Sequence, residues 1–206
     1  MSEPTVLGAV MTGGQSRRFG RNKALAEFGD RTVIERVVAA LAPAVERIVL
    51  VGSDPEPYRF LGLPIHGDLR PDCGALGGIH TAVAVAGERP VVVASCDLPL
   101  VETPLFLRLA ELASATDAAD AVVPCGRTGL QPLCAAYGPA CKSAIEAQLD
   151  RGRLKVAEFF GSVRLRLLRA EELEALGDEE RMFFNINTPE EYRRALELAG
   201  LAGDAG

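Results

Sequence analysis

The sequence predicts an α/β fold with a mostly parallel sheet, and three observations support that class. Short apolar runs rich in Val, Ile and Leu alternate along the chain with segments of helical periodicity, which is typical of parallel strands covered by helices. Hydrophobic residues make up 48% of the 206 residues and charged residues 24%, an ordinary globular mixture. Neither an internal repeat nor a low-complexity linker divides the chain. At about 150 residues per domain, we expect a single domain over residues 1–206.

The first half of the chain contains the regular elements. Five short apolar runs bounded by turn residues predict strands, at 6–11, 47–51, 64–66, 91–95 and 120–124. Apolar residues at helical spacing predict helices between them, over 33–41, in a segment that ends at Ala86, and around 105–112.

After Cys125 the pattern becomes less regular. Residues 126–129, Gly-Arg-Thr-Gly, lie between two extended stretches and predict a hairpin turn. A helix is expected over 140–149 and an extended segment over 163–168. Thr188, Pro189 and Glu191 predict the start of a last helix, with a Thr cap, Pro in the first turn and Glu at the third position. The domain therefore divides into halves of about 1–124 and about 125–200.

Composition excludes several classes of function. The net charge of −6 and the pI near 5.1 argue against a nucleic-acid binder, which needs a basic surface. The first apolar run, Val6 to Met11, is too short for a signal peptide, and no later run approaches the roughly 18 residues of a membrane span. We expect a cytoplasmic protein with no nucleic-acid or membrane partner. With five scattered cysteines and two histidines, any metal should be a hard cation on oxygen ligands.

The loop after the first strand carries a cluster of cations. In open α/β sheets ligands bind beyond the carboxyl ends of the strands, so these loops are the first places to look for a site. Residues 11–23 read Met-Thr-Gly-Gly-Gln-Ser-Arg-Arg-Phe-Gly-Arg-Asn-Lys and place four positive charges within seven residues, with no acid among them. Glycines let backbone amides approach an oxyanion closely. The loop predicts a polyphosphate cradle, with a flexible turn and a solvated basic face as the alternative.

Two familiar phosphate motifs are absent from the sequence. Neither the G-x-x-x-x-G-K-[ST] pattern of P-loops nor G-x-G-x-x-G occurs anywhere in the chain. The predicted phosphate-binding loop is therefore neither a P-loop nor a G-x-G-x-x-G loop.

Asp97 follows the strand predicted at 91–95 and should point into the same crevice. Magnesium bound to a nucleoside triphosphate takes one or two protein carboxylates and completes its shell with phosphate and water oxygens, so one Asp is sufficient. The alternative is that Asp97 caps the following helix, near Pro99 and Thr103.

A third loop, residues 67–78, follows the short strand at 64–66. Asp68 can accept hydrogen bonds from a ribose or a base, and Gly74, Gly77 and Gly78 allow the chain to pass close to a flat ring. For Asp68 taken alone, an Asx turn at the strand end is the slightly better explanation.

These motifs together resemble the nucleotidyltransferase family that includes the molybdenum cofactor guanylyltransferases, often called MobA. The similarity covers nearly the whole chain. It rests on four motifs: the pattern Gly13-Gly14, Arg17-Arg18, Phe19-Gly20 and Lys23; Asp68 with residues 74–78; Cys96-Asp97-Leu98-Pro99; and the segment 185–191, Asn-Ile-Asn-Thr-Pro-Glu-Glu.

The resemblance implies a Rossmann-like three-layer sandwich with a nucleotide-binding first half and an acceptor-binding second half. It implies that backbone around Met11, Thr12, Gly13 and Gly14 holds the nucleotide, that Lys23 contacts phosphate, and that Asp68 contacts the nucleoside. Asp97 then binds Mg²⁺. Arg17 and Arg18 would hold the outer phosphates, and the acceptor-side candidates are Gln131, Asn185 and Asn187.

The function implied is transfer of GMP from Mg-GTP to the phosphate of molybdopterin, or of its molybdenum-loaded form, with release of pyrophosphate. Possible protein partners belong to cofactor biosynthesis or molybdoenzyme maturation. Alternatives are a cytidylyltransferase or sugar-phosphate nucleotidyltransferase, and a non-catalytic module that delivers the nucleotide or cofactor. Two places depart from the family pattern, because the pair Val51-Gly52 stands where an Asn is common and Thr12 where an Ala is common.

Asn185 and Asn187 have a second explanation. Both precede the capping box at Thr188, and Asn is an ordinary turn residue. In an extended segment their amides would face the same way, with Ile186 on the opposite face.

Overall fold

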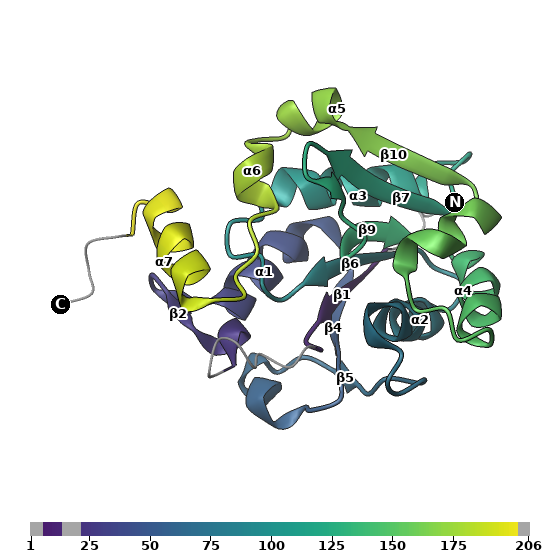
Figure 1. The fold of residues 1–206 in the computed structure, drawn as a ribbon, viewed down its shortest axis with the longest axis horizontal. Coiled ribbons are helices and arrows are strands. Elements are labelled where there is room, and N and C mark those ends of the chain that lie inside the picture. The colour runs from purple at the N-terminus through teal and green to yellow at the C-terminus, as the bar shows by residue number, and fades with distance from the viewer. Residues whose placement is uncertain (1–5, 14–21, 202–206) are drawn as a thin grey trace.

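A single mixed sheet forms the centre of the computed structural model, which describes residues 6–13 and 22–201 (Figure 1). Its strand order is β10-β7-β9-β6-β1-β4-β5, with β8 paired to β7. The strands are β1 (Leu7–Met11), β4 (Arg47–Val51), β5 (Ile65–His66), β6 (Val91–Ser95), β7 (Ala121–Gly126), β8 (Gly129–Leu130), β9 (Cys134–Tyr137) and β10 (Leu165–Arg169). Strands from both halves of the chain therefore share one sheet.

The sheet is mostly parallel, as predicted. β1 pairs in parallel with both β4 and β6, β4 pairs with β5, and β10 pairs with β7. The exceptions are β9, which runs antiparallel between β6 and β7, and the short β8. The predicted hairpin at 126–129 is confirmed, since Gly126 of β7 pairs with Gly129 of β8.

Helices cover both faces of the sheet, which gives the three-layer sandwich that the resemblance implied. Four helices contribute most of the two covering layers: α1 (Val33–Leu41), α2 (Gly74–Ala86), α3 (Thr103–Ser114) and α4 (Cys141–Leu149). Successive strand residues alternate between two cores, so Val10 packs with α1 and α3 while Ala9 and Met11 pack with α2 and α4. The sheet is therefore buried on both sides, which explains its continuous apolar strands.

A third, smaller core joins the last helix to an early hairpin. The strands β2 (Glu27–Phe28) and β3 (Arg31–Thr32) pair antiparallel, and α7 (Pro189–Leu198) packs against them (Figure 1). Phe28, Leu100, Ile186 and Ala195 form the centre of this cluster. The capping box predicted at Thr188 is confirmed at the start of α7. The sequence did not predict the hairpin or its contact with α7.

The remaining elements are short. They are two helices, α5 (Ala170–Glu174) and α6 (Glu179–Met182), and four 3₁₀ turns, η1 (Lys23–Leu25), η2 (Ala42–Ala44), η3 (Glu56–Leu61) and η4 (Val156–Ser162). Within the described residues no helix has both the length and the apolar character needed to cross a bilayer. All five cysteines are free thiols.

Candidate active site

Four strand ends meet at one edge of the sheet and bring the predicted loops together. Met11 at the end of β1 pairs with Val51 and with Ser95, and Val51 pairs with His66. The residues that follow these ends are Thr12, Gly52, Gly67 and Cys96. The three loops singled out from the sequence therefore open on the same edge, as expected for the carboxyl ends of parallel strands.

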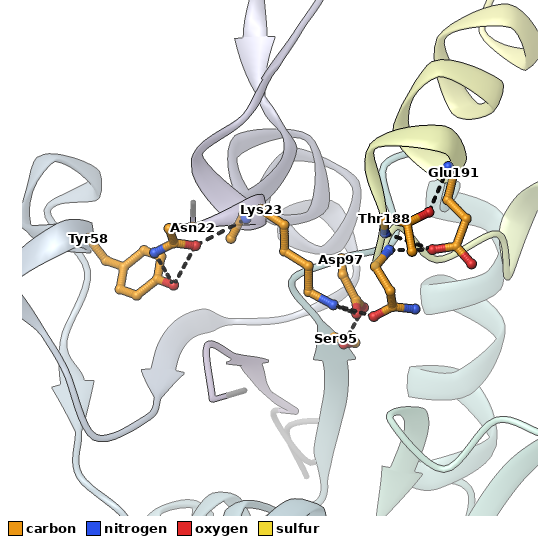
Figure 2. Close-up of polar contacts among 9 residues, drawn as sticks. Asn22, Lys23, Tyr58, Ser95, Asp97, Thr188 and Glu191 are labelled. Carbon is orange, nitrogen blue, oxygen red and sulfur yellow. Dashed lines mark hydrogen bonds and ion pairs between the residues drawn. The ribbon is translucent and has the colours of Figure 1, made fainter. Parts of the chain in front are cut away.

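Lys23 lies at the centre of this edge and reaches two residues far away in the sequence. Its ammonium donates to Asp97 Oδ2 at 2.6 Å and to Asn187 Oδ1 at 2.7 Å (Figure 2). The Lys23 and Asp97 side chains are only 15% and 13% exposed, so the pair is largely shielded from water. An ammonium has three N–H donors, and these contacts use two of them.

The backbone that carries Lys23 is fixed from its other side. The 3₁₀ turn η1 begins after Asn22, whose side-chain oxygen accepts from the Ala24 amide at 3.1 Å. Asn22 Nδ2 also donates to the hydroxyl of Tyr58 at 3.0 Å, and the Tyr58 side chain is buried (Figure 2). Burial raises the pKa of Tyr58, so the hydroxyl stays protonated at neutral pH. Sequence reasoning missed this anchor, because Asn22 and Tyr58 belong to different elements.

Asp97 is held by contacts to both of its carboxylate oxygens. Ser95 Oγ donates to Oδ1 at 2.5 Å, while Lys23 occupies Oδ2 (Figure 2). Each carboxylate oxygen has a further lone pair, so the group can accept more than these two contacts. The alternative role as a helix cap is wrong, because α3 begins at Thr103 and its cap position is Glu102. The sequence did not single out Ser95. A signal was available, because an alternating strand places residues two apart, such as Ser95 and Asp97, on one face.

Asp68 borders a pocket of about 710 Å³ at this edge of the sheet. The wall of this pocket includes Met11 and Gly13 from the first loop, and Gly74, Ala75 and Gly78 from the start of α2. Burial raises the pKa of the Asp68 carboxyl. In the described part of the chain its carboxylate accepts no hydrogen bond. An Asx turn requires such a bond to a nearby backbone amide, so that alternative is wrong, and both oxygens are available to a ligand.

A second pocket, of about 480 Å³, adjoins the first. Ser95 and Leu133 line both, so the two pockets share a wall at the end of β6. Gln131 and Asn185 line this second pocket together with Asp97, as do Phe183 and Phe184 in the chain that follows α6.

The two predicted asparagines have different environments. Asn185 is exposed and lines the second pocket, whereas Asn187 is half-buried and bonds to Lys23. Between them, Ile186 is fully buried in the third core, on the opposite side as predicted. Asn187 thus belongs to the Lys23 cluster, a contact that no local pattern around it indicates.

Three of the predicted site residues, Gly14, Arg17 and Arg18, lie outside the described residues. Their roles remain predictions from the sequence. Among residues 6–13 and 22–201, no three His, Cys, Asp or Glu side chains gather as metal ligands. Asp97 with the neighbouring Ser95 hydroxyl nevertheless offers hard oxygen donors, the type that Mg²⁺ takes when phosphate oxygens supply the rest of its shell.

The two departures from the family pattern explain each other. Thr12 Oγ1 donates to the Val51 carbonyl at 3.1 Å, which holds the Thr12 side chain directly over Gly52. A Cβ added at Gly52 would lie 2.2 Å from Thr12 Oγ1 and 3.2 Å from the Thr12 carbonyl carbon. With the Thr12 hydroxyl in this position, a side chain at position 52 would force Thr12 to move.

Gly52→Ala should therefore lower the free energy of unfolding by about 1–3 kcal/mol, the usual cost of overpacking. Denaturant unfolding measures the change. Gly67→Ala is the matched control, because a Cβ there meets no atom within 4 Å. Adding Thr12→Ala to Gly52→Ala should restore most of the loss, and a double variant as unstable as Gly52→Ala would contradict this explanation.

The fold and the site together define a class of protein. A three-layer α/β sheet carries two adjoining pockets, and a shielded lysine pairs with Asp97, which lines the second of them. This arrangement suits an enzyme that moves a nucleotidyl group from one ligand to the other. Residues 8–165 match the MobA-like NTP transferase domain. The chain belongs to the MobA-like NTP transferase family and is a nucleotidyltransferase.

Similar proteins agree with that assignment. A probable molybdenum cofactor guanylyltransferase of Carboxydothermus hydrogenoformans is 34% identical, over 94% of this chain and 96% of that protein. The molybdenum cofactor guanylyltransferase of Desulfosudis oleivorans is 33% identical, over 96% and 97%. The crystal structure of molybdopterin-guanine dinucleotide biosynthesis protein A from Archaeoglobus fulgidus superposes with a TM-score of 0.81 at 27% identity, covering 94% of this chain and 98% of that one.

Proposed function

We propose that the chain transfers GMP from Mg-GTP to the terminal phosphate of molybdopterin, or of its molybdenum-loaded form, and releases pyrophosphate. The observation that carries the proposal is the Lys23–Asp97 pair beside Ser95, one of the two residues that line both pockets. A nucleotide in the first pocket and an acceptor in the second would meet there. The names of the relatives in Carboxydothermus hydrogenoformans and Desulfosudis oleivorans support guanine as the base and the molybdenum cofactor as the acceptor.

The reaction is an in-line displacement at the α-phosphorus. An oxygen of the acceptor phosphate forms the new P–O bond as the bond to the bridging oxygen of the β-phosphate breaks, and pyrophosphate leaves with that electron pair. The attacking phosphate is already an anion, so no general base is required. Catalysis then depends on positioning and on charge neutralisation.

Lys23 would offset the negative charge that builds up during transfer. Its two contacts to Asp97 and Asn187 fix the ammonium, and its third N–H is available for a phosphate oxygen. Arg17 and Arg18 stay candidates for the outer phosphates, because a guanidinium matches phosphate oxygens with paired donors. Asp97 would hold Mg²⁺, which when bound neutralises charge on the triphosphate.

Asp68 would contact the nucleoside from the first pocket. Its half-buried carboxylate accepts hydrogen bonds, and both a ribose and a guanine edge present donors. On the acceptor side, Gln131 and Asn185 line the second pocket and would bond the pterin. The nucleotide-binding half is then about 1–124 and the acceptor-binding half about 125–200.

Pyrophosphate release tests this proposal. We expect release only when GTP, Mg²⁺ and molybdopterin are all present, and little with CTP, ATP or UTP. Release with CTP and molybdopterin, or with a sugar phosphate as acceptor, would support the alternative transferases instead. Tight binding of nucleotide and molybdopterin without any release would support a delivery module. A cytoplasmic location and partners in molybdoenzyme maturation remain predictions from the sequence.

Asn185→Ala should weaken molybdopterin binding while leaving GTP binding and the melting temperature nearly unchanged, because the exposed Asn185 side chain lines the second pocket and not the first. Thr188→Ala is the control. It removes the hydroxyl that accepts from the Glu191 amide at 3.1 Å, and it should cost about 1 kcal/mol of stability without weakening molybdopterin binding. Equilibrium binding and thermal melting separate the two. Normal molybdopterin binding by Asn185→Ala would move the pterin site elsewhere.

A further inference from the structure

We propose that Glu191 is a positioning residue of the transfer reaction, which acts through Asn187 on the Lys23 ammonium. The kinetic test of this inference rests on the proposed function, whereas a crystal structure of a Glu191 variant tests it independently of that function. The effect travels along two hydrogen bonds, from the Glu191 carboxylate to the Asn187 backbone and from the Asn187 amide to Lys23.

The capping box of α7 makes one contact more than a capping box needs. In the usual box, the Glu at the third position accepts from the backbone amide of the cap residue. Glu191 Oε2 does so with Thr188 at 2.9 Å, and the same oxygen accepts from the preceding amide, that of Asn187, at 2.7 Å. Figure 2 shows the Glu191 carboxylate turned back toward this segment.

A second capping box in the chain provides a comparison. At the start of α1, Glu35 Oε2 accepts from the Thr32 amide and the Thr32 hydroxyl, both at 2.7 Å. These contacts stay within the cap residue, so Glu35 fixes the helix start and nothing before it. The extra contact at α7 therefore reflects the position of Asn187 rather than the motif itself.

Asn187 is fixed on both sides of its peptide. The preceding residue, Ile186, is fully buried and donates its amide to the Asp97 carbonyl at 3.0 Å. Glu191 holds the amide of Asn187 itself. With the main chain held at these points, the Asn187 side chain presents its oxygen to Lys23 at 2.7 Å.

Loss of the Glu191 carboxylate should release this arrangement. The amides of Asn187 and Thr188 would lose their acceptor, and the first turn of α7 would reorganise to satisfy them. Lys23 would keep Asp97 but lose a fixed second acceptor. A small displacement of a catalytic group can cost up to roughly 10²-fold in rate.

Four variants separate positioning from helix capping. Glu191→Ala should lower kcat about 10-fold with less than about a 2-fold change in KM for GTP, because the ammonium is misplaced rather than removed. Glu191→Gln should restore kcat, since one amide oxygen can accept from both backbone amides as Oε2 does now. Glu35→Ala and Thr188→Ala lose cap contacts at α1 and α7, and both should lower the melting temperature while keeping kcat.

A double-mutant cycle tests the route through Asn187. In an Asn187→Ala background, Glu191→Ala should lower kcat by less than about 2-fold, because the side chain that transmits its effect is already gone. An undiminished effect in that background would overturn the proposal. So would a kcat for Glu191→Ala equal to that of Glu35→Ala.

A crystal structure of Glu191→Ala provides the measurement that does not depend on the proposed function. We expect the Asn187 oxygen to leave hydrogen-bonding distance of the Lys23 ammonium in that variant and to stay near its present 2.7 Å in Glu35→Ala. An unchanged contact in Glu191→Ala would overturn the inference. If the unmodified protein releases no pyrophosphate from GTP and molybdopterin, the proposed function fails, and this structure still decides the role of Glu191.

Discussion

Asp97→Asn should keep the fold and lose turnover by roughly 10²-fold or more at limiting Mg²⁺. The substitution keeps the shape of the side chain and an oxygen that can accept from Ser95 or Lys23, but it removes the negative charge. A hard cation prefers a carboxylate to a neutral amide, so the loss should be largest where Mg²⁺ is scarce. Pyrophosphate release measured over a range of Mg²⁺ concentrations gives the size of the effect.

The matched control for this variant is Asp117→Asn, which neutralises an exposed carboxylate in the loop after α3. It should leave turnover within about 2-fold, as surface substitutions usually do. Circular dichroism and thermal melting check that both variants are folded. Near-normal turnover of a folded Asp97→Asn variant at limiting Mg²⁺ would contradict the metal role.

Lys23→Ala should lower kcat by roughly 10²-fold or more while changing GTP affinity much less. The Lys23 ammonium is fixed by Asp97 and Asn187 before any substrate binds, so in the proposed reaction its charge needs no rearrangement to stabilise the transition state. A group of this kind contributes more to the rate than to ground-state binding. Single-turnover kinetics and equilibrium GTP binding separate the two contributions.

Lys23→Ala also removes one member of a shielded ion pair. Asp97, which is 13% exposed beside Lys23, would lose its charged partner, and breaking a buried pair costs up to about 3–5 kcal/mol. Kinetics should therefore be measured well below the melting temperature of the variant. Lys142→Ala, on the exposed side of α4, is the control and should change neither kcat nor GTP affinity. If Lys23→Ala weakens GTP binding and leaves kcat unchanged, the lysine is a ground-state anchor.

The strands and main helices could be predicted because their signals are local. β1, β4 and β6 are short apolar runs, and α1 carries an apolar face with a capping box at Thr32. Burial on both faces of a parallel sheet produces the first pattern, and burial of one helix face produces the second. The strand ends then located the loops that bear Lys23, Asp68 and Asp97.

The sequence by itself determined the fold class, the edge of the sheet where the candidate site lies and most of the charged residues proposed for it. Only the tertiary structure decided their partners. Lys23 meets Asp97 across 74 residues of chain and Asn187 across 164, and β9 runs antiparallel between two strands of the sheet. Local periodicity reports which face of an element is buried. Pairings of this length follow from strand order and helix packing, which depend on the whole chain at once.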